Sequence, residues 1–231
     1  MSLVKRLCFR QARRSAFRFF AEELDEMLTA FTAGLLLITV SELGDKTFFI
    51  AALLAMRHSR RLTFVGVLAA LAAMTVISVL FGQAASLLPK VYVVYAEIAL
   101  FTLFGLKLLY DASRMSSVPN PEEMEEAAET VKAQEAKHGV AINPLAVCLE
   151  AFSLTFVAEW GDRTQFATIA LAASNNPVGV TLGAVLGHGI CAAIAVLCGR
   201  AIAGRISERL LTFIGGGLFL LFGAIATVKL P

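Results

Sequence analysis

Long apolar stretches separated by short polar links dominate the pattern of this chain. Such stretches cover residues 28–56, 62–88, 91–112, 144–173, 178–203 and 208–229. A helix of about 20 apolar residues crosses the hydrocarbon core of a bilayer. The alternating ten-residue segments of a membrane β-barrel are not seen in this pattern. The pattern therefore predicts an all-α integral membrane protein with six transmembrane helices.

The composition agrees with this prediction and narrows the range of functions. The 231 residues are 58% hydrophobic and only 16% charged, with a mean hydropathy of +0.74, whereas soluble domains carry about 25% charged residues. A formal net charge of +2, with no surface of basic and aromatic residues, argues against a nucleic-acid partner. No motif of a hydrolytic enzyme is present. We therefore expect a membrane protein that is not an enzyme and has no prosthetic group.

Two polar segments lie outside the apolar stretches. Residues 1–27 begin with basic and aromatic residues and end with acidic ones, a pattern typical of a helix in the lipid headgroup region; a targeting extension is the alternative. Residues 114–143 form a long acidic link. Within it, Asn120 and Pro121 suit the start of a helix and Gly139 its end. We interpret this link as a solvated loop that contains one soluble helix.

An internal repeat divides the rest of the chain into two halves. Residues 28–113 form the first repeat and residues 144–231 the second. A shift of 117 positions aligns Glu42 with Glu159, Gly44 with Gly161, Asp45 with Asp162, and Thr47 with Thr164. Each half is predicted to hold three helices, an odd number, so the second half should enter the membrane from the opposite side. Inverted repeats of this kind usually bind their substrate near the midplane, at the repeat interface.

The repeated motif places charge where a membrane helix rarely tolerates it, because each charge near the bilayer centre costs about 2.5–3.5 kcal/mol. On a regular helix Glu42 and Asp45 share one face, and their repeats do the same. Facing halves would thus offer four carboxylates, which suit hard cations such as Mn²⁺, Ca²⁺ and Mg²⁺. The two threonines could add hydroxyl ligands if the helices are kinked or unwound near Gly44 and Gly161.

Each motif also contains a basic residue four positions after its glutamate. Lys46 and Arg163 could pair with Glu42 and Glu159 within a helix. The six charged groups sum to −2, which one divalent cation or two protons would neutralise. Crowded carboxylates hold protons more readily because like charges repel. This competition predicts a cation/proton antiporter. A buried ion-pair network and a cation channel are the alternatives.

Other polar residues also lie within the apolar stretches. Gln165 could be an accessory oxygen ligand. Glu97 could face the site or extend to the interface, and Glu150 could line an access route or relay protons. His188 is more typical of a buried hydrogen-bonding residue than of a ligand. The matching positions of the first repeat hold Phe48 in place of Gln165 and Ala33 in place of Glu150.

The orientation follows from the basic residues of the links. The links at 57–61, 114–143 and 204–209 share one side and carry most of the Lys and Arg outside the N-terminal segment. The positive-inside rule therefore places the acidic link in the cytoplasm.

Two copies of Glu-x-Gly-Asp-(Lys/Arg)-Thr, in halves joined by an acidic loop, resemble the Gdt-type cation/proton exchangers. The resemblance covers about residues 28–231. It implies that Mn²⁺ or Ca²⁺ leaves the cytosol in exchange for protons, across a prokaryotic cell membrane or a thylakoid or other organelle membrane. It also implies that the motif acids, with Thr47 and Thr164 beside them, bind the transported ion. A homodimer is compatible with the sequence.

Overall fold

A computed structural model describes residues 3–115, 122–138, 143–202 and 207–230, and the regular structure of these residues is entirely α-helical. The helices are α1 (Leu3–Glu42), α2 (Lys46–Arg57), α3 (Arg60–Ala85), α4 (Lys90–Arg114), α5 (Glu122–His138), α6 (Pro144–Ala158), α7 (Arg163–Ser174), α8 (Pro177–Ile202) and α9 (Glu208–Thr227). The predicted all-α class is confirmed.

The number of helices able to span a membrane is five or six within the described residues. Five qualify alone by length and composition: α3, α4, most of α8 and α9, and the Phe20–Glu42 part of α1. Helices α6 and α7 qualify only as a pair, which is bent by 76° at the break between them. They form either a sixth, broken span or a re-entrant loop. The prediction of six spans agrees with the first of these two arrangements.

Two of the predicted spans are not continuous helices. The stretch 28–56 is divided between α1 and α2, and the stretch 144–173 between α6 and α7. The interpretation of the motif on a regular helix is therefore wrong. Each break contains a motif glycine with positive φ, 80° at Gly44 and 83° at Gly161, a conformation that no right-handed helix contains. The expected distortion near these glycines is confirmed.

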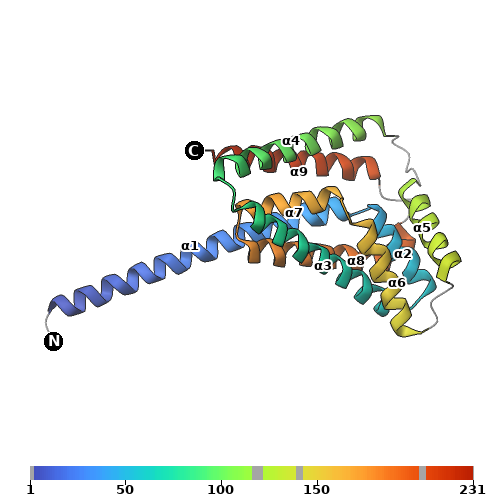
Figure 1. Cartoon of the computed structure of the whole chain (residues 1–231), viewed down its shortest axis with the longest axis horizontal. Helices are drawn as coiled ribbons and strands as arrows, with labels where there is room; N and C mark the ends of the chain where they lie inside the picture. Colours follow the sequence, from blue (N-terminus) through green and yellow to red (C-terminus); the bar gives the residue numbers. More distant parts are fainter. Residues whose placement is uncertain (1–2, 116–121, 139–142, 203–206, 231) are drawn as a thin grey trace.

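Helix packing in the first half has counterparts in the second half. Helix α1 packs on α8 as α6 packs on α3, α2 packs on α8 as α7 packs on α3, and α4 packs on α9. Figure 1 shows α4 beside α9 along one side of the bundle. Glycines allow the closest contacts, because small residues let membrane helices approach. A Cβ atom on Gly183 would lie 2.1 Å from the carbonyl oxygen of Phe31, and one on Gly66 would lie 2.5 Å from that of Cys148.

The helix predicted in the acidic link is present as α5, although Asn120, Pro121 and Gly139 lie outside the described residues. It is not merely solvated: α5 packs on α2 (Figure 1). Ala127 and Val131 are fully buried and belong to the same apolar cluster as Phe48 of α2. The link therefore contributes to the core beside the motif.

The N-terminal segment is helical from Leu3 and continues without a break into the first apolar stretch. Figure 1 shows this part of α1 extending beyond the helix bundle. The expected boundary at residue 27 lies inside the helix, and the large apolar side chains of Phe20 and Leu24 are exposed. Whether this segment lies at a membrane surface or acts as a targeting extension stays a prediction.

Candidate functional site

The two helix breaks create the site by turning the chain sharply within an apolar environment. Among the described residues, no residue other than glycine has a positive φ. The residue after each glycine is an aspartate that caps the next helix: Asp45 begins α2 and Asp162 begins α7. An aspartate side chain at this position accepts hydrogen bonds from the first backbone N–H groups of the helix. The sequence Gly-Asp thus ends one helix and starts another.

Three carboxylates from the two breaks come together in the interior. Oxygen atoms of Glu42, Glu159 and Asp162 all lie within 4.8 Å of one another. Glu42 is 2% exposed and Glu159 is 4% exposed. The hydroxyl of Thr47 donates a hydrogen bond of 3.3 Å to Oε2 of Glu42, while Oε1 of Glu42 is buried and has no hydrogen-bond partner. A buried oxygen of this kind is costly unless a cation, a proton or another donor satisfies it.

The second break holds its aspartate by local hydrogen bonds. Oδ2 of Asp162 accepts from the backbone N–H of Thr164 at 3.2 Å and from its hydroxyl at 3.0 Å. The side-chain oxygen of Gln165 accepts from the backbone N–H of Gly161 at 2.8 Å, and its Nε2 lies 3.1 Å from the sulfur of Met74. Gln165, predicted as an accessory ligand, therefore holds the turn in this structure.

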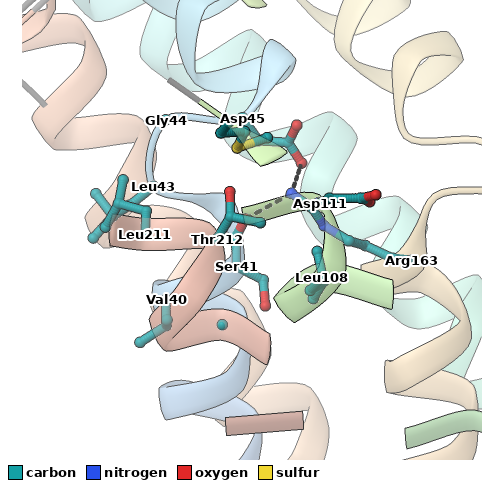
Figure 2. Close-up of a pocket in the computed structure, with 12 residues that line it drawn as sticks. Val40, Ser41, Leu43, Gly44, Asp45, Leu108, Asp111, Arg163, Leu211 and Thr212 are labelled. Atoms are coloured by element: carbon teal, nitrogen blue, oxygen red, sulfur yellow. Dashed lines mark hydrogen bonds and ion pairs between the residues drawn. The ribbon is translucent and has the colours of Figure 1, made fainter. Parts of the chain in front are cut away.

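The two basic residues of the motifs form ion pairs that the sequence did not predict. Arg163 donates a hydrogen bond of 3.0 Å to Oδ2 of Asp45 and one of 3.4 Å to the carbonyl oxygen of Ser41, so the pair joins the two halves. Figure 2 shows Arg163 reaching towards both acceptors. Lys46 forms its ion pair with Glu126 of α5, at 3.4 Å. The predicted pairing of Lys46 within its own helix is wrong, because the break separates it from α1.

A cavity of about 180 Å³ lies beside this ion pair (Figure 2). Its lining comes from α1, the first break, α4, α7 and α9, and includes Asp45, Arg163 and Asp111. Met115, which follows α4, and Leu211, near the start of α9, line it as well. The cavity therefore reaches the C-terminal end of α4, after which the acidic link begins, and the N-terminal part of α9.

The remaining predicted residues lie outside the carboxylate cluster. Glu97 is buried and pairs with Lys229 at 3.4 Å. Glu150 lies beside His58 at 3.5 Å. His188 is buried on α8, as expected, but its Nδ1 has no hydrogen-bond partner among the described residues. Neither Glu97 nor Glu150 contributes to the group formed by the three motif carboxylates.

Three polar residues near the site were not among the predicted ones. Ser41 and Asp111 line the cavity, and Glu126 pairs with Lys46. Asp111 carries a sequence signal, because it is an acid near the end of an apolar stretch. Ser41 precedes the first motif, whereas its counterpart is Ala158, so the repeat gives no reason to select it. Glu126 is one of several acids in the link.

The donors of the cluster are carboxylate and hydroxyl oxygens, the ligands that hard cations prefer. The same oxygens can hold protons when no cation is present. The arrangement supports reversible binding of a divalent cation in competition with protons.

Comparisons with known proteins also indicate an antiporter of divalent cations and protons. A family model described as divalent cation/proton antiporter GDT1 matches residues 30–116 and 147–230. A relative named GDT1-like protein sll0615, from Synechocystis sp., is 60% identical over 200 residues, which cover 87% of this chain and 97% of the relative.

Two chloroplast proteins are also similar. GDT1-like protein 2, chloroplastic, from Oryza sativa is 45% identical over 213 residues, and Protein PAM71-homolog, chloroplastic, from Arabidopsis thaliana is 43% identical over 211 residues. The matches cover 86% and 85% of this chain, and 60% and 58% of these two relatives. The chain thus spans less than two thirds of the length of the chloroplast relatives. No solved structure matches this chain.

Proposed function

The chain belongs to the GDT1 family of divalent cation/proton antiporters, and we propose that it exchanges Mn²⁺ for protons at the cluster of Glu42, Glu159 and Asp162. The observation that carries this proposal is the meeting of three carboxylates from two helix breaks, with their oxygens within 4.8 Å. Thr47 and Thr164 donate hydrogen bonds to two of these acids and place their hydroxyl oxygens beside the group.

The number of oxygen donors favours Mn²⁺ over Ca²⁺ as the transported ion. Three carboxylates and two hydroxyls supply five oxygens when each residue gives one, and a single water would complete an octahedral site. Ca²⁺ takes six to eight oxygens, and Mg²⁺ loses its hydration water reluctantly. Ca²⁺ is therefore the second candidate, and it would need bidentate carboxylates or more water.

Proton coupling follows from the charge of the empty cluster. Three ionised carboxylates in a buried space repel one another, and the repulsion grows as the effective dielectric constant falls. Either protons or a divalent cation must offset most of this charge. Binding of one would therefore release the other, which is the elementary step of an antiporter.

The proposal assigns Asp45 to a second state of the transport cycle. In this structure Arg163 holds Asp45 in an ion pair beside the cavity. Release of Asp45 by Arg163 would add a fourth carboxylate to the site and connect the cavity with it. Gly44 and Gly161 would provide the backbone freedom for this rearrangement.

Alternating access would use the two halves as inverted repeats. The matched packing of α1 on α8 and of α6 on α3 supports this arrangement, as does the common role of Gly183 and Gly66 in those contacts. Rocking of one half against the other would then expose the cluster to each side in turn.

The host membrane and the direction of transport are also parts of the proposal. The names of the chloroplastic relatives and the cyanobacterial relative support a thylakoid, other organelle or prokaryotic cell membrane. With the acidic link on the cytosolic side, as the positive-inside rule favours, the cavity faces the cytosol. Mn²⁺ would leave the cytosol through it.

The experiment is uptake of Mn²⁺ into proteoliposomes under an imposed pH gradient. The parent protein is compared with Glu42→Gln, Glu159→Gln and, as a matched control, Glu97→Gln, which alters a buried glutamate outside the cluster. We expect pH-driven uptake in the parent and the control, and its loss in the two cluster variants. Ca²⁺ in a parallel series tests the choice of ion. Equal uptake by all four proteins, or uptake that ignores the pH gradient, would contradict the proposal.

A further inference from the structure

A second group of metal-binding side chains lies at the opposite end of α2 from the carboxylate cluster. Nitrogen or oxygen atoms of His58, Glu135 and Glu150 all lie within 4.8 Å of one another. His58 follows the last residue of α2, Glu135 belongs to α5, and Glu150 belongs to α6. Helix α2 has 12 residues, so about 18 Å separates its two ends. The second group is therefore distinct from the first.

The side chains of this group are buried and poorly satisfied. The exposed fractions are 6% for His58, 7% for Glu150 and 16% for Glu135. Both carboxylate oxygens of Glu150, one of Glu135, and Nε2 of His58 are buried without a hydrogen-bond partner. The distance of 3.5 Å between Nε2 of His58 and Oε2 of Glu150 exceeds that of a normal hydrogen bond. Unsatisfied buried carboxylates are costly, and their convergence on an imidazole nitrogen indicates a shared ligand.

The charge of the surroundings leaves room for a cation. Arg57 contacts the other oxygen of the Glu135 side chain and offsets one carboxylate. With a neutral histidine, the two carboxylates and Arg57 sum to −1. A divalent cation would reverse this charge to +1 and would bridge the three side chains.

We propose that His58, Glu135 and Glu150 form a second divalent-cation site, which fastens α5 to α2 and α6. One imidazole nitrogen and two carboxylates suit Mn²⁺, Fe²⁺ or Zn²⁺. Ca²⁺ and Mg²⁺ prefer oxygen ligands alone. The second site therefore selects transition metals more strongly than the oxygen-only cluster does.

Helix α2 connects the second site to the carboxylate cluster, so a cation bound at the second site would regulate transport. This part of the inference rests on the proposed function. Helix α5 is held to α2 at both ends, by the Lys46–Glu126 pair and by the Arg57–Glu135 pair. Asp45 caps the start of α2. A cation bound at His58 would hold α5 against α2 and would restrain the rearrangement of Asp45. Cytosolic metal, on the side of the acidic link, would thus control transport.

The alternative is an ion-pair network without metal, in which a protonated His58 pairs with Glu150 and Arg57 pairs with Glu135. Mn²⁺ binding to the purified full-length protein distinguishes the two. The measurement uses the double variant Glu42→Gln/Glu159→Gln, in which the oxygen-only cluster is disabled. Binding is titrated by electron paramagnetic resonance, and spin-echo modulation detects an imidazole nitrogen bound to Mn²⁺.

In that background we expect one bound Mn²⁺ with nitrogen modulation. His58→Asn should remove the modulation and weaken binding by at least about tenfold, the lower end of what loss of a supporting partner already costs a metal site. Glu135→Gln should weaken binding but keep the nitrogen signal, and it covers the case in which His58→Asn does not fold. His188→Asn is the matched control and should change neither quantity.

The proposal would be overturned if the double variant showed no nitrogen modulation. It would also be overturned if His188→Asn removed the nitrogen modulation and His58→Asn did not. The outcome is separable from that of the proposed function. Proteoliposome uptake that succeeds without nitrogen-bound Mn²⁺ would refute the second site alone. A nitrogen-bound Mn²⁺ in a protein without exchange activity would refute the transport proposal and the regulatory role.

Discussion

Replacement of Gly161 by alanine should destabilise the protein through the backbone alone. Gly161 has a φ of +83°, and a Cβ atom at this position would have no neighbour within 4 Å. The substitution therefore introduces no clash. An L-residue in the left-handed region costs about 1–2 kcal/mol relative to the right-handed one. The smaller entropy of the unfolded alanine chain offsets about 0.4–1 kcal/mol of this cost.

Gly217→Ala provides the matched control. Gly217 lies inside α9, and a Cβ atom there also has no neighbour within 4 Å. Alanine in a helix interior is about 0.5–1 kcal/mol more favourable than glycine, so this variant should be slightly more stable than the parent. The free energies of unfolding of the two variants should thus differ by about 1–2 kcal/mol, which is the left-handed penalty itself.

The assay is equilibrium unfolding of both variants in the same detergent, with Mn²⁺ uptake measured in parallel. We expect Gly161→Ala to lower uptake as well, because Gly161 lies between Glu159 and Asp162 and sets their relative positions. If Gly161→Ala were as stable as Gly217→Ala, the reasoning that the break requires a left-handed glycine would be refuted.

Three further substitutions test separate contacts. Gly183→Ala should lower the melting temperature, because its Cβ would lie 2.1 Å from the carbonyl oxygen of Phe31 and overpacking costs about 1–3 kcal/mol; an unchanged melting temperature would contradict the close contact of α8 and α1. Thr47→Val should weaken Mn²⁺ binding, measured by titration calorimetry, because it removes the hydroxyl that donates to the buried glutamate at the end of α1; unaltered affinity would exclude a role for this hydroxyl. A double-mutant cycle of Lys46→Ala and Glu126→Ala should give a coupling energy of at most about 1 kcal/mol that falls with added salt, because both side chains are solvated; a larger, salt-independent coupling would show that the pair is buried.

The duplicated motif made much of the site predictable. Glutamate, glycine and aspartate recur at the same spacing, and a glycine beside a helix-capping aspartate signals a break within an apolar stretch. The kink at Gly44 and Gly161 could therefore be anticipated. The ion-pair partners of Lys46 and Arg163 could not be anticipated. A regular helix would place Lys46 beside Glu42, whereas the observed turn directs Lys46 towards α5.

Contacts between distant segments were the least predictable part. Helix α5 contains few apolar residues, and the sequence does not indicate which helix they contact; Ala127 and Val131 are fully buried in a cluster with residues of α2. His58 and Glu135 lie in two polar links, where charged residues are ordinarily solvated, and the repeat assigns neither a counterpart. Their convergence with Glu150 depends on the docking of α5, which tertiary packing determines.

The most direct test of the central claim is proton release on metal binding. Addition of Mn²⁺ to the purified protein in weakly buffered detergent solution should release protons, because cation and protons compete for Glu42, Glu159 and Asp162. Glu42→Gln/Glu159→Gln should release far fewer, and Glu97→Gln should match the parent. Mn²⁺ binding by the parent without proton release, or equal release by all three proteins, would contradict the claim that this cluster couples metal to protons.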